Sequence, residues 1–128
     1  MQGLILFAHG ARDARWAEPF EQVAARVRAL RPGVAVALAY LELMAPDLDA
    51  AGAALARSGC REVAVLPLFL GAGGHVRKDL PERLERLRAA HPEVRWALQA
   101  AAGESPRLVE ALAQVALDAL ENDEKDPA

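Results

Sequence analysis

The chain has 128 residues, 53% hydrophobic and 26% charged, a length and composition that suit one compact domain. Its formal net charge is −3, and the last eight residues carry four acids and one base, so the rest is nearly neutral and has no basic excess for binding nucleic acid. The single cysteine excludes an intrachain disulfide and a cysteine-rich metal site, and the absence of a signal-like or membrane-spanning apolar run predicts a cytoplasmic protein.

The N-terminal half contains two predicted strands and two predicted helices. A nearly continuous apolar run predicts a buried strand at residues 4–8. The helix that follows has Pro19 in its first turn and an apolar stripe formed by Trp16, Phe20, Val23, Ala24, Val27 and Leu30. A second buried strand is predicted at residues 34–40. The second helix opens after Pro46, with an apolar face formed by Leu48, Ala51, Gly52 and Leu55.

The C-terminal half repeats this alternation. A third buried strand is predicted at residues 63–66, and Asp79-Leu80-Pro81-Glu82 has the form of an acid-capped helix start. Residues 94–98 alternate between apolar and polar, which predicts a more exposed edge strand. Ser105-Pro106 opens a fourth helix, which is expected to bury Leu108, Val109, Leu112, Ala116 and Leu120.

Strands and helices therefore alternate in the order βαβαβαβα. This order predicts an α/β fold: a four-stranded parallel sheet with right-handed crossovers and helices on both faces. We expect residues 1–120 to form a single domain and residues 121–128 to be a frayed acidic tail.

Three residues with metal-binding side chains follow the first three predicted strands. They are His9, Glu42 and His75, separated by 33 residues in each case, which corresponds to one βα unit. Ligands of open α/β sheets bind at the carboxyl ends of the strands, so these side chains meet if the strands are neighbours. Two imidazoles and a carboxylate suit first-row divalent metals such as cobalt, iron, nickel or zinc, and three protein ligands leave coordination positions open for exchange.

The glycine-rich stretch Gly71-Ala72-Gly73-Gly74 precedes His75. It lacks the Lys-Ser/Thr that completes a phosphate-binding loop, so we interpret Gly73 and Gly74 as positions where the backbone bends close to a large flat ligand. His91 precedes Pro92 at the opposite edge of the sheet and is assigned a structural or solvent-facing role.

These residues resemble the short, single-lobe CbiX type of sirohydrochlorin chelatase. The resemblance runs from residue 4 to about residue 120 and is carried by His9-Gly10-Ala11-Arg12-Asp13, by Glu42 with Pro46, by Pro67-Leu68-Phe69-Leu70, and by Gly74-His75 with Asp79-Leu80-Pro81. The family often has serine where Ala11 stands, a difference that removes a hydroxyl but no proposed ligand.

The resemblance implies a lyase that inserts a divalent metal into the tetrapyrrole sirohydrochlorin, for cobalamin or sirohaem synthesis. The metal is a substrate, Co²⁺ first, with Fe²⁺ or Ni²⁺ as alternatives, and no organic cofactor is expected. His9 and His75 would bind the metal and Glu42 would assist, and any of the three would be a suitable proton acceptor. Longer relatives contain two such lobes, so the resemblance implies a homodimer. Substrate contacts are expected from Arg12, Met44, Leu68, Phe69, Gly73 and Gly74.

Two other functions use the same residues. A non-catalytic metal carrier would need only the three ligands, and a closed small cavity would favour it over a ring-sized cleft. A histidine phosphatase also has a histidine after its first strand, but it would want an arginine immediately before that histidine, where this chain has Ala8.

Overall fold

The structure is a computed structural model that describes residues 1–71 and 73–122. Within these ranges four parallel strands form one sheet in the order β2-β1-β3-β4. The strands are β1 (Gln2–Ala8), β2 (Ala35–Tyr40), β3 (Glu62–Pro67) and β4 (Arg95–Leu98). The α-helices are α1 (Glu18–Leu30), α2 (Leu48–Arg57), α3 (Gly74–Ala90) and α4 (Pro106–Asn122), and two short 3₁₀ helices are η1 (Ala14–Ala17) and η2 (Ala102–Glu104).

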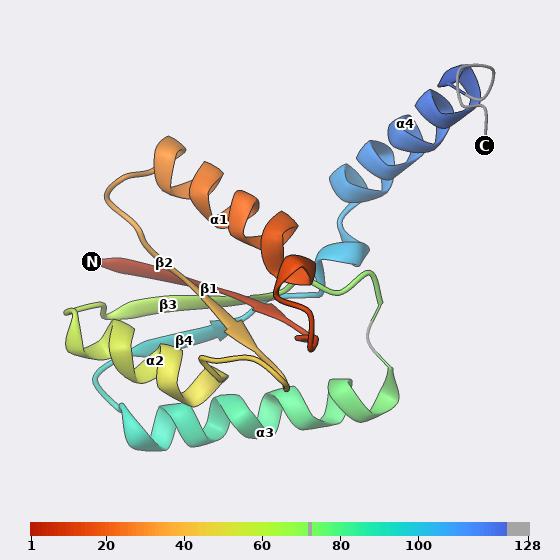
Figure 1. The fold of residues 1–128 in the computed structure, drawn as a ribbon. Coiled ribbons are helices and arrows are strands. Elements are labelled where there is room, and N and C mark those ends of the chain that lie inside the picture. The colour runs from red at the N-terminus through yellow and green to blue at the C-terminus, as the bar shows by residue number, and fades with distance from the viewer. Residues whose placement is uncertain (72, 123–128) are drawn as a thin grey trace.

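The helices cover the two faces of the sheet unequally. In Figure 1, α1 lies on one face, over β1 and β2, and α2 and α3 lie on the other. The main core fills the space between the sheet and α2 and α3, where Ile5, Phe7, Leu48, Val65 and Leu84 have no exposed surface. The predicted parallel sheet with helices on both faces is therefore confirmed.

The edge strands differ in their exposure. In β4, Val94 and Trp96 are buried and Arg95 is exposed, as the alternating pattern predicted. Strand β2, predicted to be covered on both faces, is the other edge of the sheet and is only half-buried from Ala35 to Leu38. That prediction was wrong because the apolar run alone did not indicate which strand would lie at the edge.

Helix α3 begins five residues before the predicted start near Asp79. Gly73 is its N-cap residue, and Pro81 lies inside the helix. A proline there removes one intrahelical hydrogen bond, but Leu80, Leu84 and Leu87 are all buried against the core. Their burial keeps the helix continuous, and His75 consequently lies in the first turn of a helix instead of in a loop.

Helix α4 does not bury the residues assigned to its inner face. It leaves the body of the molecule after η2 and projects away from it (Figure 1), and none of its residues is buried. Leu112 is 45% exposed and Leu120 is 73% exposed. The amphipathic pattern correctly predicted a helix, but it did not show what the apolar face would pack against. The helix also continues two residues into the predicted tail, whose remaining residues 123–128 lie outside the described part.

Candidate active site

The backbone holds the ends of three neighbouring strands together. Because β1 lies between β2 and β3, the segments that leave these strands are adjacent. The pairing continues past the strands: the Leu41 N–H donates to the Ala8 carbonyl at 2.9 Å, and the Leu68 N–H donates to the Phe7 carbonyl at 2.7 Å. The strand-end argument therefore correctly predicted which loops meet.

His9 and Glu42 are linked directly. The Glu42 N–H donates to the His9 carbonyl at 3.1 Å, so the two residues follow their strands side by side. Both side chains are exposed. An exposed imidazole and an exposed carboxylate at the carboxyl edge of the sheet are available to a ligand from solvent.

Phe69 supports the His9 imidazole. The two rings are stacked with centroids 4.1 Å apart and an angle of 27° between their planes. Phe69 is 2% exposed and also contacts Phe7 in the core, with centroids 6.0 Å apart. The stacking fixes one face of the imidazole against a buried ring and leaves the side chain open to solvent. Phe69, predicted to contact the substrate, is covered by His9 on this side.

Gly10 allows the His9 and Glu42 segments to approach each other. Its φ is +91°, in the region that favours glycine, and a Cβ at this position would lie 1.9 Å from the Glu42 carbonyl oxygen. No larger residue fits without separating the two segments. Sequence reasoning noted Gly10 only as part of a motif, since a close backbone contact leaves no local sequence signal beyond the glycine itself.

Gly103 holds the loop that follows β3. Its N–H donates to the Phe69 carbonyl at 2.8 Å, and a Cβ there would lie 1.6 Å from the Leu70 carbonyl oxygen. The η2 turn is thereby fastened to the segment that carries the ring beneath His9. Sequence reasoning missed Gly103 because it lies more than thirty residues from its partners along the chain.

The third predicted ligand, His75, is placed only by its backbone. It is the second residue of α3, and its side chain lies outside the described part of the structure. Among the residues whose side chains are described, no group of three or more His, Cys, Asp or Glu residues is arranged to hold a metal ion. The N-terminus of α3 follows the β3 exit, the same edge at which His9 and Glu42 lie.

The glycines before His75 do not have strained backbone. Gly73 has φ −66° and ψ 162°, which any residue adopts, and Gly71 and Gly74 are not among the positive-φ glycines. No positive φ therefore requires glycine at these positions, and the approach of the backbone to a large flat ligand stays a prediction. A Cβ at Gly73 or Gly74 would meet nothing within 4 Å, so the surface around them is open.

The remaining predicted substrate contacts are divided between two places. Arg12 is exposed in the loop after β1, and Leu68 is half-buried in the loop after β3. Met44 instead packs beside Ala8, Ala17 and Tyr40, on the α1 face of the sheet.

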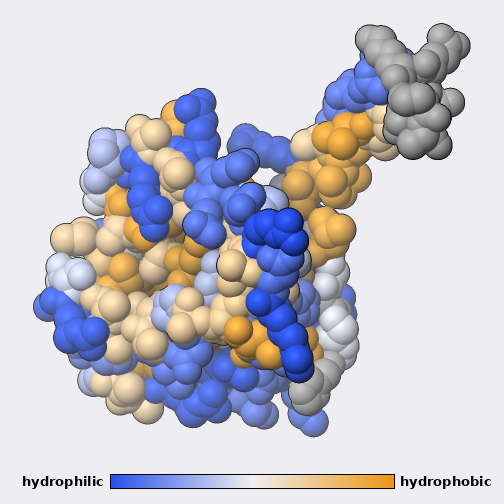
Figure 2. All heavy atoms as spheres, in the orientation of Figure 1, coloured by the Kyte–Doolittle hydropathy of each residue, from blue (hydrophilic) through white to orange (hydrophobic). Residues whose placement is uncertain are grey.

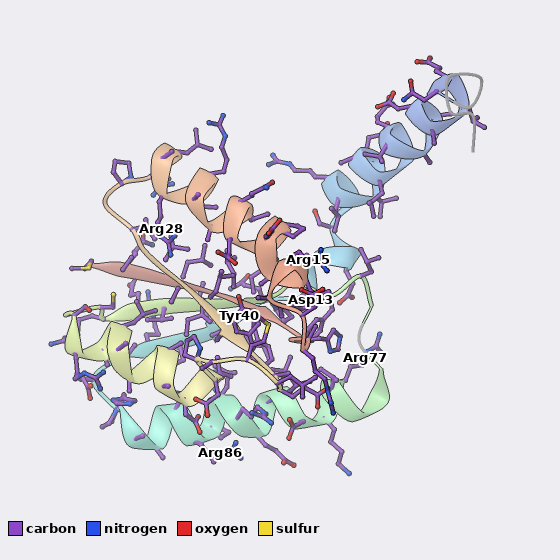
Figure 3. All side chains as sticks on the ribbon, viewed as in Figure 1. Asp13, Arg15, Arg28, Tyr40, Arg77 and Arg86 are labelled. Carbon is purple, nitrogen blue, oxygen red and sulfur yellow. The ribbon has the colours of Figure 1, made fainter. Side chains whose placement is uncertain are left out.

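Basic side chains surround the strand ends. Figure 3 shows Arg77, from the first turn of α3, at the same end of the molecule as Asp13 and Arg15. The Arg15 guanidinium pairs with Asp13 at 2.9 Å and holds the pKa of that carboxyl below its usual value. Arg77 and Phe69 also line a small cavity of about 150 Å³.

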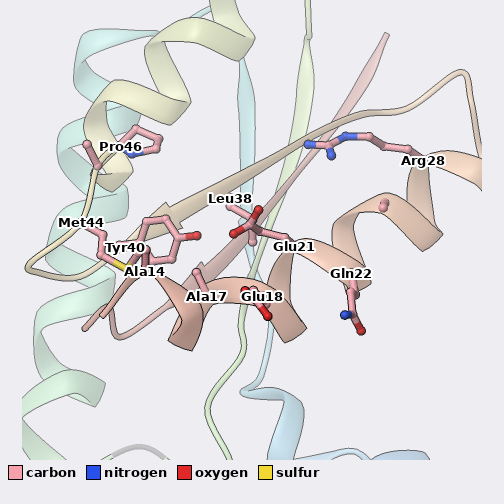
Figure 4. A pocket seen from close by; sticks show the side chains of 12 residues that line it. Ala14, Ala17, Glu18, Glu21, Gln22, Arg28, Leu38, Tyr40, Met44 and Pro46 are labelled. Atoms are coloured by element: carbon pink, nitrogen blue, oxygen red, sulfur yellow. The ribbon is translucent and has the colours of Figure 1, made fainter. Parts of the chain in front are cut away.

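A wide open groove lies on the outer side of α1. It has a volume of about 830 Å³ and runs between α1 and the edge strand β2 (Figure 4). Glu18, Glu21 and Arg28 give it polar walls, and Met44 and Tyr40 lie at one end. Burial, with a smaller effect from Glu21, raises the pKa of Tyr40.

His91 lies away from the strand ends, as predicted. It caps the C-terminus of α3, its carbonyl accepts a hydrogen bond from the Trp96 indole at 3.3 Å, and its ring lies 3.8 Å from Glu93.

No helix in residues 1–71 and 73–122 combines the length and apolar character that a membrane span requires.

The chain is similar to known proteins over most of its length. The family model CbiX matches residues 3–119. A sirohydrochlorin cobaltochelatase of Sulfolobus acidocaldarius is 31% identical over 85 residues, which cover 66% of this chain and 68% of that one. A sirohydrochlorin cobaltochelatase of Sulfurisphaera tokodaii is 30% identical over 88 residues, 69% of this chain and 72% of that one.

Solved structures share the fold. The putative cobalamin (vitamin B12) biosynthesis CbiX protein from Marinobacter aquaeolei superposes with a TM-score of 0.84 at 40% identity, over 95% of this chain and 99% of that one. SirB from Bacillus subtilis with Fe³⁺ has a TM-score of 0.74 at 25% identity, and the match covers 88% of this chain but only 45% of SirB. The family match over residues 3–119 and the agreement of the fold show that this chain belongs to the CbiX family.

Proposed function

We propose that this chain is a chelatase that inserts a divalent cation into sirohydrochlorin, for cobalamin or sirohaem synthesis. Co²⁺ is the first candidate substrate metal, and Fe²⁺ and Ni²⁺ are alternatives. The observation that carries this proposal is the meeting of His9 and Glu42 at the carboxyl edge of the sheet, in a chain whose relatives are named sirohydrochlorin cobaltochelatases.

The proposed metal ligands are His9, Glu42 and His75. The exposed imidazole and carboxylate supply one nitrogen and one oxygen donor, and His75 would add the second imidazole from the first turn of α3. This donor set suits borderline divalent ions. Because His9 is stacked on a buried ring, it would meet the cation with little loss of side-chain freedom.

The reaction exchanges one cation for two protons. The macrocycle loses two pyrrole N–H protons as its four nitrogens bind the metal, and the metal leaves its protein ligands. Each of His9, Glu42 and His75 is chemically able to accept a proton as the metal departs. Open coordination positions are required, because a fully enclosed ion would not be transferred.

We place the macrocycle over the strand ends and not in the α1 groove. The surface at Gly73 and Gly74 is open, and Arg12 and Arg77 supply positive charge for the carboxylates of the substrate. The groove beside α1 has Glu18 and Glu21 in its wall, which would repel those carboxylates. Leu68 is proposed to contact the ring on the apolar side.

We also propose that the working unit is a homodimer of single chelatase-like domains, each formed by residues 1–120, in the cytoplasm. The chain spans less than half of SirB, so two copies would supply the two walls that a longer relative has in one chain. The buried, unpaired thiol of Cys60 is in keeping with a reducing compartment.

Insertion assays test this proposal against a metal carrier. Purified protein is mixed with sirohydrochlorin and with Co²⁺, Fe²⁺ or Ni²⁺ in turn, and the absorbance of the macrocycle is followed. A chelatase gives many turnovers at a rate above the uncatalysed reaction with at least one metal. A carrier binds metal stoichiometrically and leaves the insertion rate unchanged, which would refute the proposal.

A further inference from the structure

Leu43 and Leu70 are large apolar residues exposed at the strand exits. Leu43 is 58% exposed and Leu70 is 69% exposed. The other large apolar residues that are exposed in residues 1–71 and 73–122 lie at the N-terminus, in α1 or in α4. Figure 2 shows apolar surface beside strongly hydrophilic side chains at the end of the molecule where β1 and β2 end. Single exposed leucines are common on protein surfaces, so exposure alone assigns them no role.

The backbone of Leu43 adopts an unfavourable conformation. Its φ is 67°, and in the part of the chain that the structure describes it is the one residue other than glycine with a positive φ. This left-handed region is sterically costly for a residue with a Cβ, and glycine or asparagine adopts it more readily than leucine. The turn itself therefore does not explain why a leucine stands there. Costly backbone conformations of this kind are concentrated at binding and catalytic sites.

Hydrogen bonds hold the loop that carries Leu43. The Glu42 N–H donates to the His9 carbonyl at 3.1 Å, immediately before Leu43. The Tyr40 N–H donates to the Pro46 carbonyl at 2.9 Å, which closes the loop on itself. Leu43 is therefore next to a proposed metal ligand, on a loop fixed at both ends, and its side chain faces solvent.

Leu70 lies on a similarly constrained loop. The Gly103 N–H donates to the Phe69 carbonyl at 2.8 Å, and a Cβ at Gly103 would lie 1.6 Å from the Leu70 carbonyl oxygen. Phe69 stacks on the His9 ring, so Leu70 directly follows the residue that supports this imidazole. The contact with η2 fixes the Leu70 backbone beside the site and leaves its side chain uncovered.

The two leucines follow strands on opposite sides of the strand that carries His9. Strand β1 lies between β2 and β3, and neighbouring strands are about 4.8 Å apart. The exits that carry Leu43 and Leu70 are thus roughly 10 Å apart, with the exit that carries His9 between them. A flat macrocycle placed over His9 and Glu42 is broad enough to extend over both neighbouring exits.

We infer that Leu43 and Leu70 are the apolar contacts that hold the macrocycle of sirohydrochlorin over the strand exits. This assignment rests on the proposed function and names two substrate-binding residues for it. Phe69 is 2% exposed and Met44 packs on the α1 face, so these two predicted contacts offer little surface. Covering two exposed isobutyl groups removes apolar surface from water, and residues on fixed loops lose little freedom on binding.

Binding of metal-free sirohydrochlorin tests this contact. Leu43→Asn keeps a residue that tolerates positive φ and removes the apolar side chain, so it should weaken binding about tenfold. Leu70→Asn should weaken it by a similar factor. Leu43→Met, which keeps an apolar side chain, should bind nearly as the parent does. Leu30→Asn is the matched control, because Leu30 is 61% exposed at the C-terminal end of α1, and it should bind as the parent does.

Three further measurements separate a substrate contact from a structural role. Co²⁺ binding without sirohydrochlorin should be unchanged in Leu43→Asn and Leu70→Asn, because neither leucine supplies a metal ligand. The melting temperature of Leu43→Asn should equal that of the parent or exceed it, because asparagine adopts this φ at a lower cost. In insertion assays both variants should raise KM for sirohydrochlorin more than they lower kcat.

Each of three results would overturn the inference and leave the proposed function standing. The first is a parent protein that binds sirohydrochlorin and Leu43→Asn and Leu70→Asn variants that bind it equally well. The second is weaker Co²⁺ binding by Leu43→Asn, which would show that this residue acts through Glu42. The third is a change of sedimentation in either variant, which would assign that leucine to a contact between subunits. A parent protein that binds no sirohydrochlorin would refute the proposed function and the inference together.

Discussion

At the scale of single residues, the imidazole of His9 is the part of the site that the structure defines best. Its position depends on a buried aromatic ring from another strand exit and on a glycine that lets the Glu42 segment approach. A residue that is exposed and yet held in place by the core is suited to binding, because its orientation costs little to maintain.

Substitutions of His9 and His91 distinguish an effect on the proposed metal site from a general effect on the fold. His9→Ala should reduce the cobalt insertion rate by at least about a hundredfold, because it removes a proposed metal ligand. His91→Ala, at the far end of β4, should retain nearly the parent rate. Both rates are measured by absorbance with sirohydrochlorin and Co²⁺. Equal losses in the two variants would indicate a general effect on folding and contradict the assignment of His9.

Tyr40 offers a direct titration, since it is the single tyrosine of the chain. Its side chain is 5% exposed, and burial raises its pKa, with Glu21 adding to the effect. The phenolate absorbance should therefore appear only above the ordinary value of 10.0. Because the folded-state pKa is raised, the contribution of Tyr40 to stability is complete below the ordinary pKa of 10.0. That contribution is lost as the pH rises from there through the raised folded-state pKa.

Two variants check the titration of Tyr40. Tyr40→Phe should remove the absorbance change, and Glu21→Gln should lower the midpoint by part of the shift. A midpoint at the value of a free tyrosine in the native protein would show that the ring is solvated.

The places of the proposed ligand residues in the fold were predictable from the sequence, and the contacts that support them were not. His9, Glu42 and His75 follow strands that an apolar pattern reveals, so their places at the sheet edge follow from chain order. Phe69 and Gly103 support the site through contacts between distant parts of the chain. Such contacts depend on three-dimensional packing, which a pattern along the sequence does not encode.

At the scale of elements, the strand exits are held in register by glycine. Gly10→Ala places a methyl group against the Glu42 carbonyl at a positive φ, so it should destabilise the protein by about 2 kcal/mol or more and lower the insertion rate. Gly33→Ala is the matched control, with open space around it and no positive φ, and should change stability by no more than about 1 kcal/mol. Thermal unfolding measures both, and a Gly10→Ala protein as stable as the Gly33→Ala protein would contradict the close approach.

Element boundaries were predicted well where burial and local signals agree. The second helix begins after Asp47, whose side chain accepts a hydrogen bond from the Ala50 N–H at 2.8 Å, close to the start that Pro46 indicated. The third helix was predicted too short because Pro81 resembles a residue in the first turn of a helix. The helix instead begins at Gly74 and continues through Pro81, and the burial of Leu80 favours this longer helix. The fourth helix was predicted correctly, but its surroundings depend on the rest of the fold.

At the scale of the whole molecule, one half-covered sheet and one uncovered helix point to assembly. A chain of this size that leaves five large apolar side chains of α4 between 45% and 73% exposed has not buried all the surface it offers. The homodimer proposed above would bury part of this surface. The active unit and the stable unit would then be the same dimer.

X-ray absorption of the Co²⁺ complex tests the central claim most directly. The claim is that the strand exits gather two imidazoles and one carboxylate around the metal. The parent protein should show two imidazole nitrogens in the first shell at about 2.0–2.2 Å, as histidine ligands of zinc do. His9→Ala and His75→Ala should each show one, and His91→Ala should still show two. A first shell of oxygen atoms alone in the parent protein, unchanged by either ligand substitution, would contradict the account.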